Sequence, residues 1–131
     1  MTHSFEEAIA ACVGGVETAE AEDGCLQVRA TARFPESFVG FAGHFPKAPV
    51  LPAIVQLAAV RLLVEQTVQQ HLEGERFSRT KFRGMVGPAE DIFFQLKIDG
   101  TSDGWQGKFK ITSEAMTTIS SGSFAFTTVS A

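Results

Sequence analysis

Hydrophobic and polar residues follow two periods along this chain, and these periods separate helical from extended segments. Ser4 and Glu7 form a capping-box pattern, and apolar residues then recur at helical spacing as far as Cys12. A short amphipathic helix is therefore predicted, and Gly14 with the glycine after it would end it. From Leu26 to Thr31, apolar and polar residues alternate, which predicts a half-buried strand.

Prolines are concentrated between Pro35 and Pro52, and this density excludes regular structure and predicts a fixed, extended loop. Pro52 suits the first position of a helix. From Ala53 to Val64 the residues are apolar apart from Gln56 and Arg61, so the helix should be buried on most sides. Its polar end, Glu65 to His71, is expected to emerge into solvent.

The remaining sequence predicts strands separated by turn residues. The expected strands are Phe77 to Val86, Asp91 to Ile98, Trp105 to Ser113 and Thr118 to Val129. We interpret them as an antiparallel meander. Such a sheet buries a helix that is apolar on most sides only by curling around it, so an α+β fold is predicted, with residues 1–131 as one domain.

Composition narrows the functional classes. A chain of 131 residues, 44% of them hydrophobic, buries one core, and 12 Phe without any Tyr suggest a large apolar interior or channel. The net charge of −4 argues against nucleic acid as a partner. No segment has the length of a membrane span, and Glu6 and Glu7 do not suit a secretory signal, so a cytoplasmic protein is expected. Cys12 and Cys25 lack metal-type spacing and are interpreted as free thiols.

The segment Phe41 to Gln56 carries the candidate chemistry. It reads Phe-Ala-Gly-His-Phe-Pro-Lys-Ala-Pro-Val-Leu-Pro-Ala-Ile-Val-Gln. It resembles the active-site segment of the beta-hydroxyacyl-acyl-carrier-protein dehydratase superfamily, in which Gly-His-Phe-Pro is followed by Pro-Val-(Met/Leu)-Pro-Gly and a buried helix. The matching positions are His44, Pro46, Pro49, Pro52 and Gln56. Lys81-Phe82-Arg83, Val86, Pro88 and Asp91 resemble the family's next strand and turn.

The resemblance implies a hot-dog fold, in which a curved sheet wraps a long helix and two subunits join edge to edge with apolar tunnels near their interface. In the family, the loop histidine acts with a carboxylate from the partner's helix. His44 matches the histidine and is the candidate catalytic base, since imidazole transfers protons near neutral pH. By position, Ala53 and Ile54 match the backbone amides that stabilise the thioester oxygen. Gly43, Phe45 and Pro52 complete the loop and helix start and are assigned to substrate binding.

Two positions depart from the family pattern. Ala53 stands where Gly is usual, which is a mild change in backbone freedom. Ala58 stands where the helix carboxylate is expected, so the general acid is missing. Arg61 lies one turn later on nearly the same face, so Ala58 and Arg61 are included in the predicted substrate site. Arg61 would alter the tunnel or stabilise a leaving oxygen, but its guanidinium stays charged and cannot supply a proton readily.

Three functional hypotheses remain open. The first is a 3-hydroxyacyl thioester dehydratase of fatty acid or related acyl-chain biosynthesis, acting on acyl-carrier-protein or coenzyme A thioesters. The second is a hot-dog protein that binds acyl chains or a carrier without turnover, or pairs with another subunit that supplies the acid. The third is a thioesterase, which generally also needs a carboxylate. A homodimer is expected, with a heteromer as the alternative, and no metal or redox cofactor is implied.

A small basic stripe lies on the predicted strand after the helix. Arg79, Lys81 and Arg83 alternate on one face in an otherwise acidic chain. Acyl carrier proteins are typically acidic, so the stripe could guide a carrier to the tunnel mouth. A solvated strand face that discourages edge aggregation explains the same pattern equally well.

Overall fold

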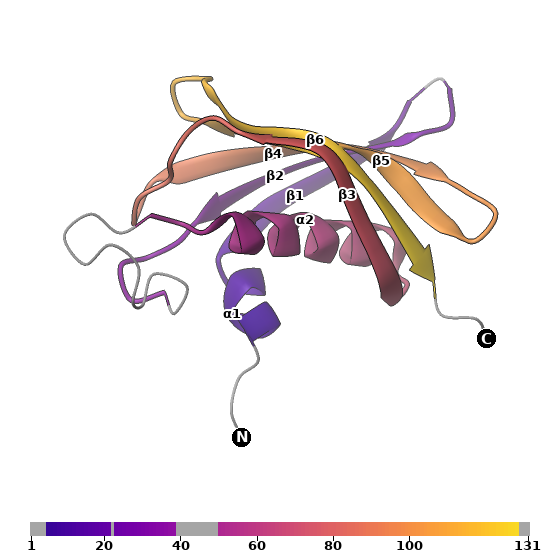
Figure 1. Ribbon diagram of the computed structural model, residues 1–131, viewed down its shortest axis with the longest axis horizontal. Coiled ribbons are helices and arrows are strands. Elements are labelled where there is room, and N and C mark those ends of the chain that lie inside the picture. The colour runs from indigo at the N-terminus through magenta and orange to yellow at the C-terminus, as the bar shows by residue number, and fades with distance from the viewer. Residues whose placement is uncertain (1–4, 22, 39–49, 129–131) are drawn as a thin grey trace.

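The computed structural model describes residues 5–21, 23–38 and 50–128, and in these ranges a curved antiparallel sheet wraps around one long helix (Figure 1). The elements along the chain are α1 (Phe5–Ala10), β1 (Val13–Glu20), β2 (Leu26–Arg33), α2 (Ala53–Val68), β3 (Leu72–Phe82), β4 (Asp91–Gly100), β5 (Gly104–Ser113) and β6 (Thr118–Thr128). This is the α+β, helix-in-sheet arrangement that the sequence predicts.

The strand order is β1-β2-β4-β5-β6-β3, with every neighbouring pair antiparallel. The prediction of a meander through all four late strands is therefore wrong for the first of them. Strands β4, β5 and β6 do form a meander, but β3 crosses to the far edge and pairs with β6, with Phe77 opposite Phe124. Because α2 lies across the sheet, the chain that leaves it returns at the edge, and β3 becomes an edge strand (Figure 1).

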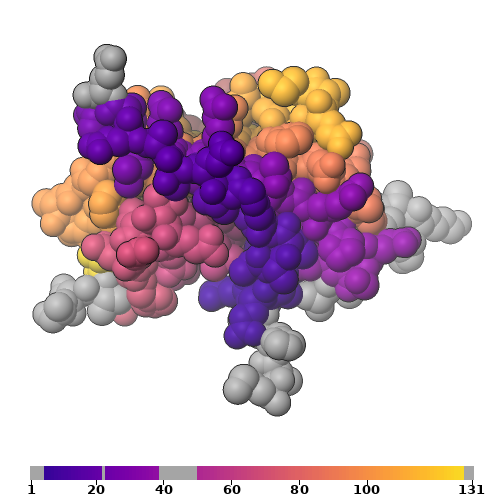
Figure 2. Space-filling view, turned by 180° about the vertical axis from the view of Figure 1, so that it is seen from behind, coloured from indigo at the N-terminus to yellow at the C-terminus, as the bar shows by residue number. Residues whose placement is uncertain are grey.

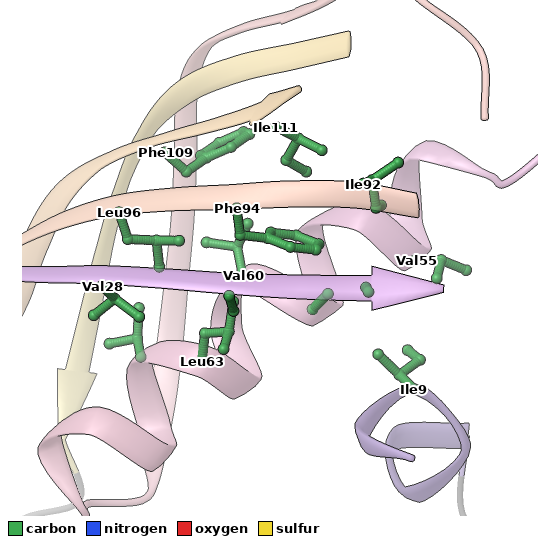
Figure 3. Packing of buried hydrophobic residues seen from close by; sticks show 14 of the residues in the cluster. Ile9, Val28, Val55, Val60, Leu63, Ile92, Phe94, Leu96, Phe109 and Ile111 are labelled. Carbon is green, nitrogen blue, oxygen red and sulfur yellow. The ribbon is translucent and has the colours of Figure 1, made fainter. Parts of the chain in front are cut away.

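The core lies between α2 and the concave face of the sheet. One face of the helix buries Val55, Gln56, Ala59, Val60, Leu63 and Val64. In Figure 3, Val60 and Leu63 point toward Val28, Phe94 and Leu96, which project from the strands. The opposite face of α2 is less covered than predicted: Leu57, Ala58 and Leu62 are half-buried, and the side chain of Ile54 is 71% exposed.

The N-terminal helix closes one end of this core. Helix α1 spans Phe5–Ala10, which confirms a short N-terminal helix, but Gly14 and Gly15 do not end it, because they lie in β1. Its Ile9 is fully buried, below Val55 in Figure 3. The predicted cap Ser4 lies outside the described residues. Figure 2 shows α1 and β1, in indigo, exposed on the face seen from behind. Cys12 and Cys25 are free thiols, half-buried and buried, as predicted.

Strand β1 was missed by the sequence analysis. After the half-buried Val13 every residue of the strand is exposed, so the sequence carries no alternation that would mark a strand. A register shift between Gly14 and Glu17, with Gly15 at φ +58°, also interrupts the pairing with β2. β1 is an edge strand held by backbone hydrogen bonds to β2, and burial contributes little to it.

The end of α2 and the start of β3 differ from the prediction. The helix runs to Val68, and Gln69 ends it in the left-handed region at φ 55°, donating its backbone N–H to the carbonyl of Glu65. β3 begins at Leu72, five residues before the predicted strand, and ends at Phe82. The helix end predicted to emerge into solvent was Glu65 to His71. Gln66, Gln69, Gln70 and His71 are exposed, but Glu65 is only partly exposed and is paired with Arg61.

Candidate active site

The predicted active-site loop lies largely outside the described residues. Gly43, His44 and Phe45 fall within residues 39–49, so their assigned roles stay predictions. What the structure describes is the helix end that the loop leads into, the cavity beside it and the sheet behind it.

The N-terminus of α2 presents free backbone donors. Pro52 precedes the helix with an extended backbone, φ −62° and ψ 150°, and no side chain caps it. The amides of Val55 and Gln56 reach back to the carbonyl of Pro52 at 3.1 and 3.3 Å. Among the described residues, no partner bonds to the amides of Ala53 and Ile54, as expected for the first turn of a helix. Two N–H donors at the positive end of a helix dipole suit an oxygen that gains negative charge.

Two contacts fix the position of this helix end. The amide of Leu51 donates to the carbonyl of Val86 at 2.7 Å, and both residues are buried. One turn into the helix, the hydroxyl of Ser120 on β6 donates to Oε1 of Gln56 at 2.8 Å. Ser120 is fully buried and Gln56 is 3% exposed, so this bond is shielded from water. Gln56 was recognised only as a motif position, and nothing in the sequence pairs it with Ser120.

A cavity of about 120 Å³ lies beside Ala58, the position where the resemblance predicts a carboxylate. Three of the predicted substrate-site residues, Ile54, Ala58 and Arg61, line it together, at successive turns of one face of α2. The remaining lining residues are Glu6, Leu57, Leu62, Glu65 and Glu75. The cavity therefore combines an apolar floor with one guanidinium and three carboxylates from α1, α2 and β3.

Arg61 joins α2 to the start of β3. Its Nη1 donates to Oε1 of Glu75 at 3.2 Å, and its Nη2 donates to the carbonyl of Leu72. Its Nε lies 3.6 Å from Oε1 of Glu65, too far for a hydrogen bond, and is buried without a hydrogen-bond partner. The other carboxylate oxygen of Glu65 accepts from the amide of Leu72 and lies 3.1 Å from Nδ1 of His71.

This network changes the interpretation of the site in two ways. Glu65 and Glu75 are engaged by Arg61, so neither is a free acid standing in for the helix carboxylate. The guanidinium is directed at β3 and paired with Glu65 and Glu75, which leaves little positive charge to stabilise a leaving oxygen. Glu75 was missed by the sequence analysis. If β3 had been predicted to start at Leu72, the alternation along the strand would have placed Glu75 on the side that faces α2.

The basic residues after α2 do not form the regular stripe that was predicted. A bulge in β3 sets Arg79 and Thr80 opposite Gly122, and Arg79 has φ 53°. The bulge breaks the alternation, and the strand ends at Phe82, before Arg83. Arg79, Lys81 and Arg83 are all exposed at this edge, so their role in carrier docking stays a prediction.

The model of the ApeI dehydratase family matches residues 18–123, most of the chain and all of the sheet except the start of β1 and the end of β6. The chain belongs to the ApeI-like dehydratase family. This places it in the superfamily that its loop and helix sequence resembles. A search of curated proteins finds no significant match.

Solved structures share the fold at low sequence identity. A chain of the dehydratase heterocomplex ApeI:P from Xenorhabdus doucetiae superposes with a TM-score of 0.67 at 18% identity, covering 77% of this chain and 87% of that chain. Zebra fish thioesterase superfamily member 2 gives 0.65 at 11% identity over 92% and 85% of the two chains. A hypothetical thioesterase from Streptococcus pneumoniae, solved with coenzyme A, gives 0.62 at 9% identity over 95% and 94% of the two chains.

These likenesses establish the hot-dog fold of dehydratases and thioesterases for this chain. In the described ranges, no helix is long and apolar enough to cross a membrane. Within the same ranges, no group of three or more His, Cys, Asp or Glu side chains is placed to hold a metal ion.

Proposed function

We propose that this chain is the histidine-bearing subunit of a heteromeric 3-hydroxyacyl thioester dehydratase. The observation that carries the proposal is the cavity at Ala58, where the family places an acid and where the nearby Glu65 and Glu75 are bound to Arg61. The loop motif around His44 is retained, so half of the catalytic pair is present. A partner with a helix carboxylate would supply the other half.

The reaction needs a base, an acid and a site for negative charge. His44 would take the proton from C2 of the 3-hydroxyacyl thioester, while the amides of Ala53 and Ile54 stabilise the thioester oxygen as charge develops on it. The C3–O bond then breaks, the partner's carboxyl group protonates the departing hydroxyl, and water and a 2-enoyl thioester result. The acyl group would be attached to an acyl carrier protein or to coenzyme A.

The known structures support a paired arrangement. The neighbour from Xenorhabdus doucetiae is a dehydratase heterocomplex. The resemblance of the His44 loop to the dehydratase superfamily implies a site that combines a loop of one subunit with a helix of the other. In such a dimer of unlike subunits, the His44 loop of this chain would meet the carboxylate of its partner, so one of the two sites would be complete. The pneumococcal neighbour, solved with coenzyme A, supports a thioester carrier as the substrate class.

The test is hydration of trans-2-enoyl thioesters by the purified chain and by three variants. Restoring the acid with Ala58→Glu should raise turnover about 100-fold over wild type, since general acid catalysis contributes at least that much. Ala58→Gln is the matched control, because it has the same size without an ionisable group. His44→Ala in the Ala58→Glu background should remove the gain.

Arg61 calls for a fourth variant. A glutamate at position 58 lies three residues before Arg61 on the helix surface. Arg61 is already paired with Glu65 and Glu75, but at this distance it still favours the ionised form of the new glutamate, which weakens it as an acid. Combining Ala58→Glu with Arg61→Leu should therefore raise turnover above Ala58→Glu alone and move the pH optimum upward. If wild type turns over as fast as Ala58→Glu and only His44→Ala is silent, the heteromeric proposal fails and the chain is a complete enzyme. If no variant turns over any thioester, the acyl-binding alternative replaces it.

A further inference from the structure

The convex face of the sheet carries a basic surface in a chain whose net charge is −4. Outward positions follow from the strand registers, because residues directly opposite one another point to the same face. Seven of the chain's 11 lysines and arginines project from this face. Arg33 is paired with Asp91 at the end of β2. The other six are Arg29, Arg76, Lys81, Lys97, Lys108 and Lys110, and we call them the convex basic band.

The band is ordered in rows across the strands. In one row, Lys81 lies opposite Ser121, Ser121 opposite Lys110, Lys110 opposite Gln95, and Gln95 opposite Arg29. Its three cations are separated by two strands each, a spacing of roughly 10 Å. That spacing equals seven residues of an α-helix, about 10.5 Å. A helix with carboxylates at such intervals has the complementary charge pattern.

The next row holds a like-charge contact. Lys97 lies directly opposite Lys108 on β4 and β5, and Lys110 is the next outward residue on β5, roughly 7 Å away. Like charges directly opposite each other destabilise a sheet. Lys97 is partly neutralised by Asp23, whose Oδ2 lies 3.4 Å from its Nζ. Among the described residues, Lys108, Lys110 and Arg29 have no ion-pair partner, although Glu17 lies opposite Arg29 in the register.

Two shallow hollows lie on this face. One of about 450 Å³ is lined by Arg76, Lys97 and Lys108 among others, and one of about 270 Å³ by Arg29, Lys97, Lys108 and Lys110. Gln27, Gln95, Gln106, Ser78 and Ser123 fill the spaces between the cations. The lysine, arginine, glutamine and serine side chains of this face suit a transient partner held by charge, whereas membrane binding normally needs large apolar side chains that insert into the lipid.

The band also lies behind the catalytic end of α2. Lys110 precedes Ile111 on β5, and Ser121 follows Ser120 on β6. Ile111 and Ser120 are paired on the concave side, where Ser120 contacts Gln56. Lys81 brings the row to the β3 edge, next to Arg79 and Arg83. A partner on the band is thus separated from the first turn of α2 by the thickness of the sheet and reaches that turn around β3.

We propose that the convex basic band docks an acidic helix of the acyl carrier protein that presents the substrate. This inference rests on the proposed function for the identity of the partner. It extends the docking surface from the β3 edge to the outer face of the sheet, with Lys108 and Lys110 as its centre.

The test measures two quantities, so that docking and catalysis are separated. The dissociation constant for a purified acyl carrier protein is measured by titration calorimetry at low and high salt, and turnover is measured with carrier-linked and coenzyme A-linked enoyl thioesters in the Ala58→Glu background. Lys108→Ser with Lys110→Ser should weaken carrier binding about tenfold at low salt and leave turnover of the coenzyme A thioester unchanged. Lys97 is left in place because it holds Asp23.

Arg79→Ser with Arg83→Ser is the charge-matched comparison. If only this edge pair weakens carrier binding, the docking surface is the β3 edge and the band proposal is overturned. It is also overturned if the carrier does not bind while anionic phospholipid vesicles do, or if the Lys108 and Lys110 variant binds the carrier like wild type. Loss of turnover with both thioesters while carrier binding persists would count against the proposed function and leave the docking proposal standing.

Discussion

At the scale of single residues, the buried bond between Ser120 and Gln56 best illustrates how a motif position acquires meaning. The sequence places a lone glutamine in an apolar helix, and the structure provides its partner on β6, 64 positions later in the chain. A buried amide oxygen without a donor is costly, so the pair fixes the helix against the sheet at one height. That height sets where the free amides of Ala53 and Ile54 lie.

Removing the hydroxyl should expose this dependence. Ser120→Ala leaves Oε1 of Gln56 buried without a donor and is expected to lower the free energy of unfolding by about 1–3 kcal/mol. Urea denaturation measures the change. Ser123→Ala, at an outward and half-buried position of the same strand, is the matched control and should alter the free energy by less than about 0.5 kcal/mol. Equal effects of the two substitutions would contradict the assignment.

At the scale of elements, the position of β3 depends on how α2 ends and on the hydrogen bonds that join α2 to the start of β3. Gln69 turns the chain with a positive φ that non-glycine residues adopt at a cost, and this turn directs the chain to the β3 edge. Arg61 and Glu65 then bind the backbone of Leu72, the first residue of that strand. The left-handed turn at Gln69 and the bonds from Arg61 and Glu65 to Leu72 together position β3 beside β6.

The cap yields a stabilising substitution. Gln69→Gly should raise the free energy of unfolding by up to about 1 kcal/mol, because glycine adopts the left-handed conformation without a steric penalty. Gln66→Gly, in the exposed helical turn before it, should lower that free energy by about 1 kcal/mol. Thermal unfolding of the two variants should therefore shift in opposite directions, and a shared direction would refute the role assigned to Gln69.

Asp23, between β1 and β2, forms an ion pair with Lys97 on β4 that weakens at acid pH. Hydrogen bonds from the Cys25 thiol and amide, together with Lys97, lower the pKa of Asp23 to about 2. Because the pKa is lower in the folded state than the usual value of about 4, these interactions stabilise the hairpin above that pH and are lost as pH falls toward 2. Carboxyl NMR titration should give a midpoint near 2 for Asp23. Lys97→Met should raise the midpoint, but not to the ordinary value, since the Cys25 bonds remain.

At the scale of the whole molecule, we expect a second subunit to join at the β3 edge. Exposed apolar side chains, Ile54, Phe82 and Met85, gather near the start of α2 and the end of β3. Along β3, Glu73 and Glu75 precede the basic Arg76, Arg79 and Lys81. Because Glu75 is paired with Arg61 of its own chain, Glu73 of each antiparallel copy would face the basic residues of the other. We infer that unlike and like subunits compete for this edge.

This inference predicts the outcome of one matched pair of substitutions. Phe82→Lys should shift the chain from dimer to monomer in analytical ultracentrifugation, because it places a charge in the apolar part of the joint. Val16→Lys is the control: its side chain is 42% exposed against 44% for Phe82, but it lies on β1 at the opposite edge of the sheet. A dimer that persists in Phe82→Lys, or a wild-type chain that stays monomeric at high protein concentration, would refute the inference.

The sequence by itself determined the fold class and the superfamily, and it predicted Ala58 at the position of the helix carboxylate. It could do so because alternation, helical spacing and the loop motif are local properties, and Ala58 is identified by counting two residues from Gln56. The short helix α1, the strand at Leu26 and the three strands β4, β5 and β6 followed from the same local patterns. β1 was not predicted, because an exposed edge strand has no hydrophobic period.

Only the tertiary structure decided which residues meet. The place of β3 beside β6, the bond between Gln56 and Ser120 and the engagement of Arg61 by Glu75 all join positions far apart in the chain. The convex basic band is a property of register, since its lysines become neighbours only when β4 and β5 pair. Such contacts depend on how a curved sheet closes around a helix, and no local period records that geometry.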